Sequence, residues 1–319
     1  MKKSLLTAYG AIITAMLFWS LSFIWYKEAY VNFSPVTVIF LRLIIACIML
    51  LFTAFLFFKI QKVHKKHFWL FFWLAFFEPF LYFMAEGHVL NYISATPASV
   101  IISLIPILTP FAAWLFLKHT INPLNMAGLA ISFFGVGLVV FAGSTDLSAN
   151  SFGVALMFLA VLAALGYSMV LVKLLKFYNT ITVMTFQNLI ALLLFLPFFL
   201  IFEVKDFLKI PFEFQTYLPI FKLGFFASFL AFTLFVYSIK RIGITIANMF
   251  TYLIPAFTAL FAYLILNEEL YLQTILGIVV VIFGLTLPSI PKILHKEKLN
   301  IDETVEEALS ETESAPIIP

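Results

Sequence analysis

The chain carries an internal duplication within its long apolar runs. About forty residues recur without gaps 149 positions later, so that Leu104-Ile105-Pro106 returns as Leu253-Ile254-Pro255 and Gly128 returns as Gly277. Apolar segments share leucines by chance, whereas matched prolines and glycines are harder to explain by composition. A duplication of this kind in a membrane protein indicates a transporter that is built from two related halves.

The composition places both halves in a bilayer. Hydrophobic residues make up 63% of the chain and charged residues only 11%, and a soluble protein of this length could not bury so much apolar surface. Ten apolar stretches are each long enough to cross a hydrocarbon core, which needs about 20 helical residues. They cover residues 6–25, 36–58, 68–90, 96–117, 124–142, 152–172, 181–202, 217–238, 245–266 and 272–291. We therefore expect an all-α integral membrane protein with ten transmembrane helices.

The basic residues predict the orientation of these helices. With the N-terminus in the cytoplasm, fourteen Lys and Arg residues fall on the cytoplasmic side and four on the outer side, with Arg42 left inside a span. Cytoplasmic loops carry the excess of Lys and Arg in membrane proteins. Both termini of this multi-pass protein are therefore expected in the cytoplasm, and the membrane is expected to be the cytoplasmic (inner) membrane.

The number of spans in each half predicts an inverted repeat. Residues 1–146 and 147–292 each hold five spans, an odd number, so the second half enters the membrane from the opposite side. Exchanging the conformations of two such halves converts an outward-open form into an inward-open one. Residues 293–319 form an acidic tail, which we expect to be disordered in the cytoplasm.

Metal and cofactor chemistry find little support in the chain. The single Cys47 lies inside the second span, which excludes a disulfide framework and a thiolate metal site. His64 and His67 are interpreted as part of a solvated, lysine-rich loop. We expect no cofactor and no metal. The expected partners are a small-molecule substrate and the lipid bilayer, without nucleic acid, in a monomer or a homodimer.

Several motifs resemble the drug/metabolite transporter superfamily, and within it the ten-helix EamA-type members. The resemblance extends from residue 1 to about residue 292. Its strongest parts are residues 94–98 leading to Pro106, and residues 243–255 leading to Asn267-Glu268-Glu269. Arg42 matches a common arginine of the second helix. The resemblance implies ten helices, a central cavity and secondary transport.

Two positions depart from the pattern of this superfamily. Trp19-Ser20 stands where an aromatic-Gly pair is usual, and Lys118-His119-Thr120 stands where the first half would be expected to carry an acidic pair. The resemblance leaves the substrate open, because members carry amino acids, nucleotide-related compounds, vitamins and drugs.

Polar groups inside the spans are the candidates for function. A charge at the bilayer centre costs about 2.5–3.5 kcal/mol on insertion scales, so such a group should face protein or a water-filled cavity. Glu78, Tyr82 and Glu86 are spaced four residues apart, which predicts one stripe on one helical face. Arg42 and Glu86 lie about 10 Å and 6 Å below the outer ends of their helices at 1.5 Å per residue. These depths allow an ion pair that merely locks two helices, or an Arg42 that contacts an anionic group of the substrate or closes an outer gate.

Glu78 lies deeper and has no basic partner at its level in the sequence. Because desolvation favours the neutral form of a carboxyl group, Glu78 is a candidate proton carrier. A structural alternative is a protonated glutamate that is hydrogen-bonded to a neighbouring carbonyl. Glu86 is assigned with it to proton coupling or gating.

Further polar and aromatic residues on five other spans could complete a substrate site with Arg42 and Tyr82, although each is more often an interhelical hydrogen bond than a ligand contact. The predicted substrate-binding residues are Trp19, Ser20, Arg42, Tyr82, Tyr167, Gln187, Asn188, Tyr237, Asn248 and Tyr252.

The prolines and glycines of the repeat suggest separate mechanical roles. Pro106 and Pro255 each remove a helical hydrogen bond and are candidate hinges. Gly128 and Gly135 are seven residues apart, as are their counterparts Gly277 and Gly284, so each fifth helix carries a smooth stripe. Such stripes let helices approach closely. We expect packing within the fold or at a dimer contact.

The combined features predict a secondary active transporter. The expected cargo is a small metabolite, an amino acid or a related organic solute, that is exported by alternating access with proton coupling or by exchange. A membrane-embedded enzyme and a channel or receptor subunit are the alternatives. An enzyme would show clustered His, Asp or Glu at the loop–membrane boundaries, and uphill accumulation would separate a transporter from a channel.

Overall fold

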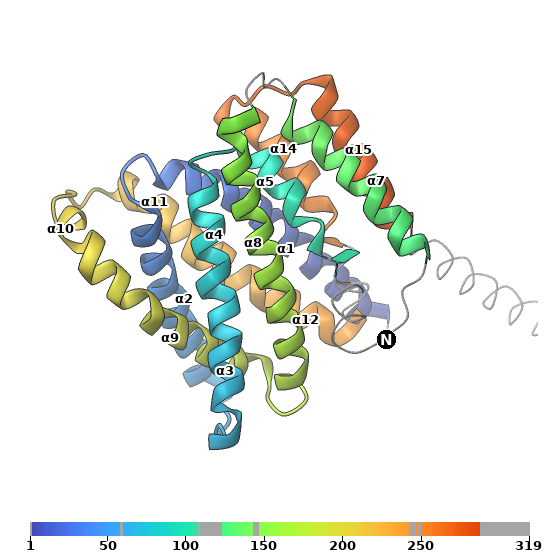
Figure 1. Cartoon of the computed structure of the whole chain (residues 1–319). Coiled ribbons are helices and arrows are strands. Elements are labelled where there is room, and N and C mark those ends of the chain that lie inside the picture. The colour runs from blue at the N-terminus through green and yellow to red at the C-terminus, as the bar shows by residue number, and fades with distance from the viewer. Residues whose placement is uncertain are drawn as a thin grey trace, which may run out of the picture.

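The computed structural model describes residues 2–57, 60–105, 107–108, 123–142, 147–242, 247 and 250–287, and in this part of the chain all regular structure is helical (Figure 1). The first half contains α1 (Lys2–Ala29), α2 (Pro35–Phe57), a short 3₁₀ turn η1 (Lys65–His67), α3 (Phe68–Ala75), the π-helical η2 (Phe76–Leu81), α4 (Tyr82–Val89), α5 (Ala95–Ile102) and α7 (Pro123–Val140).

The second half repeats this order of helices. It contains α8 (Leu147–Leu174), α9 (Thr180–Phe198), the π-helical η3 (Phe199–Glu203), α10 (Val204–Phe207), α11 (Phe214–Lys222), the π-helical η4 (Leu223–Ala231), α12 (Phe232–Ile242), α14 (Leu253–Leu266) and α15 (Leu272–Thr286).

Joined end to end where they are continuous, these elements form ten apolar helical segments. Six of them are 23 to 28 residues long and apolar enough to cross a bilayer, and three shorter apolar helices cover Met126–Val140, Leu253–Leu266 and Leu272–Thr286. The tenth is α5, the described start of the predicted 96–117 span. The predicted all-α fold with ten membrane helices is therefore confirmed. The acidic tail 293–319 lies outside the described residues.

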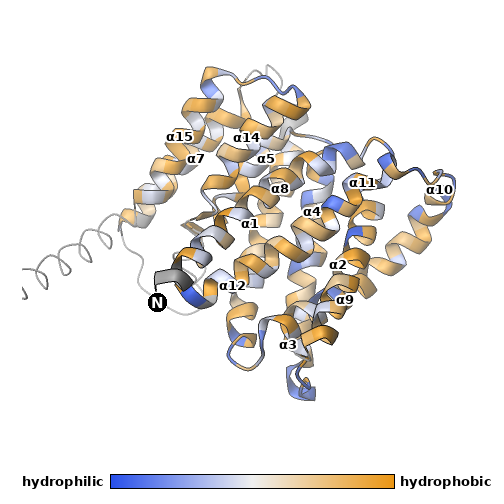
Figure 2. Cartoon of the chain, turned by 180° about the vertical axis from the view of Figure 1, so that it is seen from behind, coloured by the Kyte–Doolittle hydropathy of each residue, from blue (hydrophilic) through white to orange (hydrophobic). Residues whose placement is uncertain are grey.

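The outer surface of the bundle is apolar, as a lipid environment requires. Large side chains such as Phe52, Leu193 and Val279 are more than half exposed on three different helices. Figure 2 shows hydrophobic residues along the helices and hydrophilic ones mainly at their ends. Soluble monomeric proteins rarely expose an apolar surface of this extent.

The two halves are related by an inverted repeat that places counterpart helices against each other. Helix α2 packs on α9, α5 on α14, and α7 on α15. Figures 1 and 2 both show α7 and α15 side by side at one edge of the bundle.

The glycine stripes form the contact between α7 and α15, so they act within the fold. A Cβ atom added at Gly277 would lie 2.9 Å from the Gly135 carbonyl oxygen, and one at Gly284 would lie 2.7 Å from that of Gly128. These two pairs exchange under the 149-residue offset. Ser132 hydrogen-bonds the Val281 carbonyl, its own counterpart, at 3.4 Å. Such a reciprocal contact is what a two-fold axis between two related halves produces.

This close approach predicts a sharp difference between two glycines of α7. Gly135→Ala should destabilise the protein by about 1–3 kcal/mol, because the new methyl group would lie 2.8 Å from the Val281 nitrogen. Gly137→Ala should be neutral or stabilising, because no atom lies within 4 Å of its added Cβ. Thermal unfolding of both variants in detergent measures the difference. Equal melting temperatures would contradict the assigned packing.

The predicted hinge at Pro255 lies at the beginning of a helix, not inside one. Helix α14 begins at Leu253, and a turn at Thr251–Tyr252 interrupts the chain immediately before it. A proline in the first helical turn removes no intrahelical hydrogen bond. A similar turn at Ser103–Leu104 ends α5. Pro106 lies outside the described residues.

Candidate functional site

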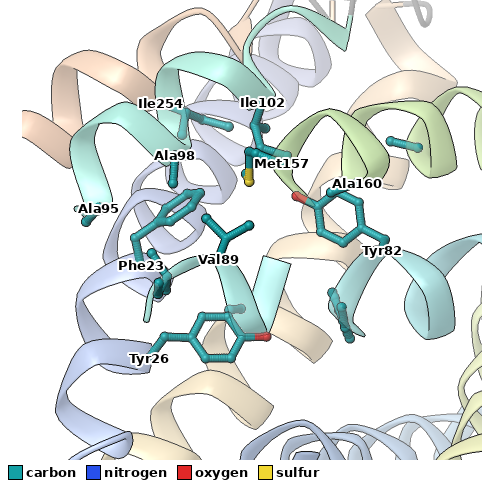
Figure 3. Packing of buried hydrophobic residues seen from close by; sticks show 14 of the residues in the cluster. Phe23, Tyr26, Tyr82, Val89, Ala95, Ala98, Ile102, Met157, Ala160 and Ile254 are labelled. Carbon is teal, nitrogen blue, oxygen red and sulfur yellow. The ribbon is translucent and has the colours of Figure 1, made fainter. Parts of the chain in front are cut away.

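A cavity of about 130 Å³ lies at the centre of the bundle, between the two halves. It is lined from α1, α2, the third span, α5, α8, α12 and α14. Six of the predicted site residues line it, namely Trp19, Arg42, Glu78, Tyr82, Glu86 and Tyr167. Figure 3 shows Phe23 of α1, Tyr82 of α4, and Ile102 and Ile254 of the two counterpart helices in this region.

The guanidinium group of Arg42 is held from three sides. Its Nε donates a hydrogen bond to Ser228 Oγ at 2.7 Å, and its Nη1 donates to the hydroxyl oxygen of Tyr26. Its central carbon lies 4.2 Å from the ring centroid of Phe83, a cation–π contact. Only 3% of Arg42 is exposed. These contacts fix the charge in the cavity wall and still leave donor hydrogens on the guanidinium.

Arg42 and Glu86 do not form the ion pair that their depths allow, and a tyrosine hydroxyl adjoins both groups instead. No Arg42–Glu86 ion pair within 4.0 Å occurs among the described residues, because the Tyr26 hydroxyl lies between the two groups. Tyr82 donates a second hydrogen bond to Glu86 Oε1 at 3.0 Å. The direct ion pair was one of the alternatives that helix depth allowed, and depth alone could not show that α1 places a tyrosine beside both groups.

Glu78 lies at a break in the third span. Its backbone is extended, with φ −147° and ψ 121°, inside the π-helical segment η2, so the predicted unbroken stripe of Glu78, Tyr82 and Glu86 is interrupted. All three side chains nevertheless line the same cavity. Glu78 is 7% exposed, and no described residue forms a hydrogen bond to its carboxyl group. The alternative of a glutamate bonded to a neighbouring carbonyl finds no support in the described residues.

Aromatic rings form the remaining wall. Trp19 donates its indole N–H to the Ala227 carbonyl at 3.3 Å, and its ring lies 5.0 Å from the rings of both Phe232 and Phe235. The polar edge of the indole is therefore satisfied by the backbone. Its apolar faces are left for packing and for the cavity.

The cavity is sealed on one side. We call the end of the bundle with loops 30–34, 90–94 and 267–271 the sealed end, and the end with loops 60–67 and 175–179 the open end. Lining residues toward the sealed end, such as Phe23 and Phe83, are buried. Those toward the open end, such as Ser168, Phe235 and Ile239, are half-buried. Among the described residues, access to the cavity therefore increases toward the open end.

The other predicted site residues do not line the cavity. Ser20 is fully buried and donates to the Met16 and Ile254 carbonyls. Asn188 donates to the Met184 carbonyl at 2.8 Å, one turn earlier in its own helix. Gln187 is buried near the lining residue Tyr167 and does not itself line the cavity.

The two remaining predicted tyrosines also lie away from the cavity. Tyr237 lies under the guanidinium of Arg241, at 3.5 Å from ring centroid to guanidinium carbon. Tyr252 is buried in the turn before α14. Neither is a lining residue. Asn248 lies outside the described residues.

Sequence reasoning missed Tyr26 and Ser228, the two partners of Arg42. Both are ordinary residues of apolar helices. A signal for Ser228 was available. The first three spans match their partners more weakly, at an offset near 146 at which Phe40 corresponds to Phe186, and at this offset Ser228 is the counterpart of Tyr82. Tyr26 had no such signal, since its position at the end of the first span resembled an interfacial anchor.

Comparisons with known proteins assign the family. The model of the EamA-like transporter family matches residues 6–141 and again residues 151–290. The chain belongs to the EamA-like transporter family. It is therefore a multi-pass membrane transporter and not an enzyme. The two matches correspond to two related halves of the chain.

Relatives of this EamA transporter leave its substrate open. Two uncharacterized transporters of Archaeoglobus fulgidus are each 28% identical to it, over 278 and 271 residues. The alignments cover 86% and 84% of this chain, and 94% and 93% of the relatives. A solved crystal structure superposes with a TM-score of 0.66 at 16% identity, over 88% of this chain and 97% of that one, which supports the fold alone.

Proposed function

We propose that this EamA transporter is a secondary active transporter that exports a small organic solute, an amino acid or a related compound, across the cytoplasmic membrane. The observation that supports this is the central cavity. It presents the guanidinium group of Arg42, the carboxyl group of Glu78, to which no described residue forms a hydrogen bond, and aromatic walls. A solute with an anionic group, a cationic or donor group and a compact apolar body would match these three features.

The proposed mechanism is alternating access by the two halves, residues 1–146 and 147–292. The cavity lies between them and is sealed at one end, which is the arrangement that one of two related conformations requires. Glu78 would bind and release one proton in each transport cycle, which would couple export to a proton gradient. If Glu78 instead binds a donor group of the solute, transport would be restricted to exchange. The turns at Ser103–Leu104 and Thr251–Tyr252, which interrupt the two counterpart spans, are the proposed hinges in place of the two prolines.

The first experiment on this function compares metabolites of cells with and without the gene, inside the cells and in the medium. If the protein is an exporter, deletion of the gene should lower the concentration of its solute in the medium and raise the concentration inside the cells. Uptake into proteoliposomes with the identified solute then tests uphill movement. Solute movement that only equilibrates gradients would contradict uphill transport and indicate a channel or an uncoupled carrier.

The sealed end is held closed by a carboxylate that joins the two halves. Glu268, in the loop after α14, accepts hydrogen bonds from the Ala95 backbone N–H at 3.0 Å and from the Thr96 hydroxyl at 3.1 Å. Negative charge is favourable at the N-terminus of a helix such as α5. Asn267, in the left-handed region at φ 54°, turns the chain so that Glu268 reaches back. We interpret Glu268 as a latch.

Glu268→Gln should therefore shift the transporter toward the form that opens at the sealed end. Losing the charge of these hydrogen bonds costs roughly 1 kcal/mol, or about fivefold in the population ratio. The readout is the reaction rate of Ala98→Cys, fully buried in this conformation, with an impermeant maleimide, in a Cys47→Ser background. Glu269→Gln is the matched control, because Glu269 is bonded by Tyr271 of its own loop. Equal rates in both variants would contradict the latch.

The proposed orientation can be tested by labelling. A cysteine at exposed Lys62 should react with an impermeant reagent only in inside-out vesicles, and one at exposed Asn32 only in intact cells. The reason is that the excess of Lys and Arg marks the cytoplasmic side. Labelling of Lys62→Cys from outside would reverse the orientation and place both termini outside.

A further inference from the structure

The loop between α2 and α3 forms a basic pocket outside the central cavity. Two adjoining cavities of about 250 and 760 Å³ lie along residues 60–67. Lys62 and His64 line both cavities, Lys66 and His67 line the first, and Lys65 lines the second. Neither lining contains an Asp or Glu. The pocket therefore presents cationic and donor groups without a counter-charge in its wall.

This loop is held in place by the neighbouring span. Its Gln61 backbone N–H donates to Thr182 Oγ1 at 2.9 Å, and its Gln61 side chain accepts from the Asn179 backbone N–H at 2.5 Å. The His64 backbone N–H donates to the Tyr178 hydroxyl oxygen at 3.0 Å. A binding site that is preorganised in this way loses less entropy when it captures a ligand.

A buried histidine supplies a donor to the pocket. Tyr178 accepts from His64 N–H, so its own hydroxyl hydrogen is free to donate to His67 Nδ1 at 2.8 Å. With this assignment Nδ1 is the acceptor, and a neutral His67 carries its hydrogen on Nε2. No described residue forms a hydrogen bond to that nitrogen. His67 is only 9% exposed and lines the pocket.

The surroundings of the pocket are those of a membrane interface. Phe68, Trp69 and Phe177 are more than half exposed beside the loop. Trp69 stacks on Phe72 at 5.2 Å. Aromatic residues of this kind lie at the level of lipid headgroups, with acyl chains on one side and water on the other. A ligand here has access to both a charged cradle and an apolar belt.

The basic character of this pocket is not a consequence of the repeated fold. At the 146-residue offset, Gln61 corresponds to Phe207. Phe207 lines a cavity of about 130 Å³ at the opposite end of the bundle, and that cavity contains Glu203 and Asp206 in place of lysines and histidines. The linings of the two cavities thus differ in charge, basic along residues 60–67 and acidic at the opposite end of the bundle.

From these observations we infer that the pocket of residues 60–67 binds the phosphate of an anionic phospholipid. Lys62 and Lys66 would neutralise the phosphate charge, and His67 Nε2–H and the loop would hydrogen-bond its oxygens. The acyl chains would lie against Phe68 and Trp69. Clusters of basic residues beside membrane helices recognise anionic headgroups by this combination of charge and position.

The test is lipid competition on the full-length protein. The purified protein is incubated with equal amounts of phosphatidylglycerol and phosphatidylcholine, and retained lipid is counted by native mass spectrometry. The wild-type protein should retain phosphatidylglycerol preferentially. Lys62→Gln with Lys66→Gln should reduce that preference by roughly tenfold to thirtyfold. His67→Phe should reduce it several-fold while keeping the ring contacts with Phe177 and Tyr178.

The matched control is Lys173→Gln with Lys176→Gln. These exposed lysines lie at the same end of the bundle but do not line the pocket. An equal loss in the control would overturn the proposal, because general charge would then explain the preference. Displacement of the lipid by inorganic phosphate alone would overturn the lipid assignment and indicate a soluble anion. A preference that appears only after deletion of residues 293–319 would assign the pocket to the acidic tail.

Discussion

Arg42→Gln is expected to weaken substrate binding by roughly ten- to a hundredfold, because it removes a charge-assisted hydrogen bond of about 1.5–3 kcal/mol. Arginine stays charged within the membrane. The structure shows this charge clamped by Ser228, Tyr26 and Phe83 at the cavity wall. Substrate affinity is measured by titration of the purified protein, or by the half-saturation concentration of uptake in proteoliposomes.

If the role of Arg42 is purely structural, the variants should behave differently in folding and in substrate binding. Removing Arg42 alone leaves Glu86 with only its tyrosine partners in a buried site, so folding itself could suffer. The double variant Arg42→Gln with Glu86→Gln removes both charges and should restore the melting temperature. If this well-folded double variant binds substrate as tightly as the wild type does, Arg42 is a helix lock and not a substrate contact.

Tyr26→Phe tests the tyrosine contact between Arg42 and Glu86 separately from the charge of Arg42. It removes the hydroxyl between Arg42 and Glu86 but keeps the Ser228 hydrogen bond and the Phe83 contact of the guanidinium. Substrate affinity should therefore fall less than in Arg42→Gln. Arg42→Lys provides the complementary control, because it keeps the charge but loses the planar fork that several partners require.

Glu78→Gln is expected to abolish uphill transport driven by a pH gradient while leaving exchange of substrate for substrate largely intact. Glutamine keeps the shape of the side chain but cannot bind and release a proton. Glu78 suits this role because it lines the cavity, is buried, and has no hydrogen bond from a described residue. Both activities are measured in proteoliposomes, with and without an imposed pH gradient.

The control for Glu78 is Glu213→Gln, the same change at an exposed residue between the spans. It should leave both activities unchanged. Normal gradient-driven accumulation in Glu78→Gln would return this residue to a structural role. Loss of exchange together with uphill transport would indicate instead that Glu78 contacts the solute.

The helices and their inverted repeat were predictable because they depend on local properties. A run of about 20 apolar residues must cross the bilayer as a helix, since no water is present to satisfy a bare backbone. The 149-residue offset likewise located the glycines of α7 and α15 before their contact was known. The sequence left open whether these stripes meet within one chain, and the packing of α7 on α15 answers that.

The candidate site was predictable only in part. Trp19, Tyr82 and Tyr167 line the cavity as expected, whereas Ser20 and Asn188 turn to backbone carbonyls of helices. Sequence spacing gives the depth of a residue along its helix. It does not give the direction in which that helix is rotated against its neighbours, and this direction decides between a cavity and a packed interface.

The sequence by itself determined the membrane class, the number of helices, their inverted pairing and the small set of charged groups inside the spans. These follow from hydrophobic length and from repetition, which act residue by residue along the chain. The tertiary structure alone decided that Tyr26 separates Arg42 from Glu86, that the chain breaks at Glu78, and that Glu268 caps α5. Each of these joins residues distant in sequence or depends on packing between spans, and such contacts are set by side-chain packing in three dimensions.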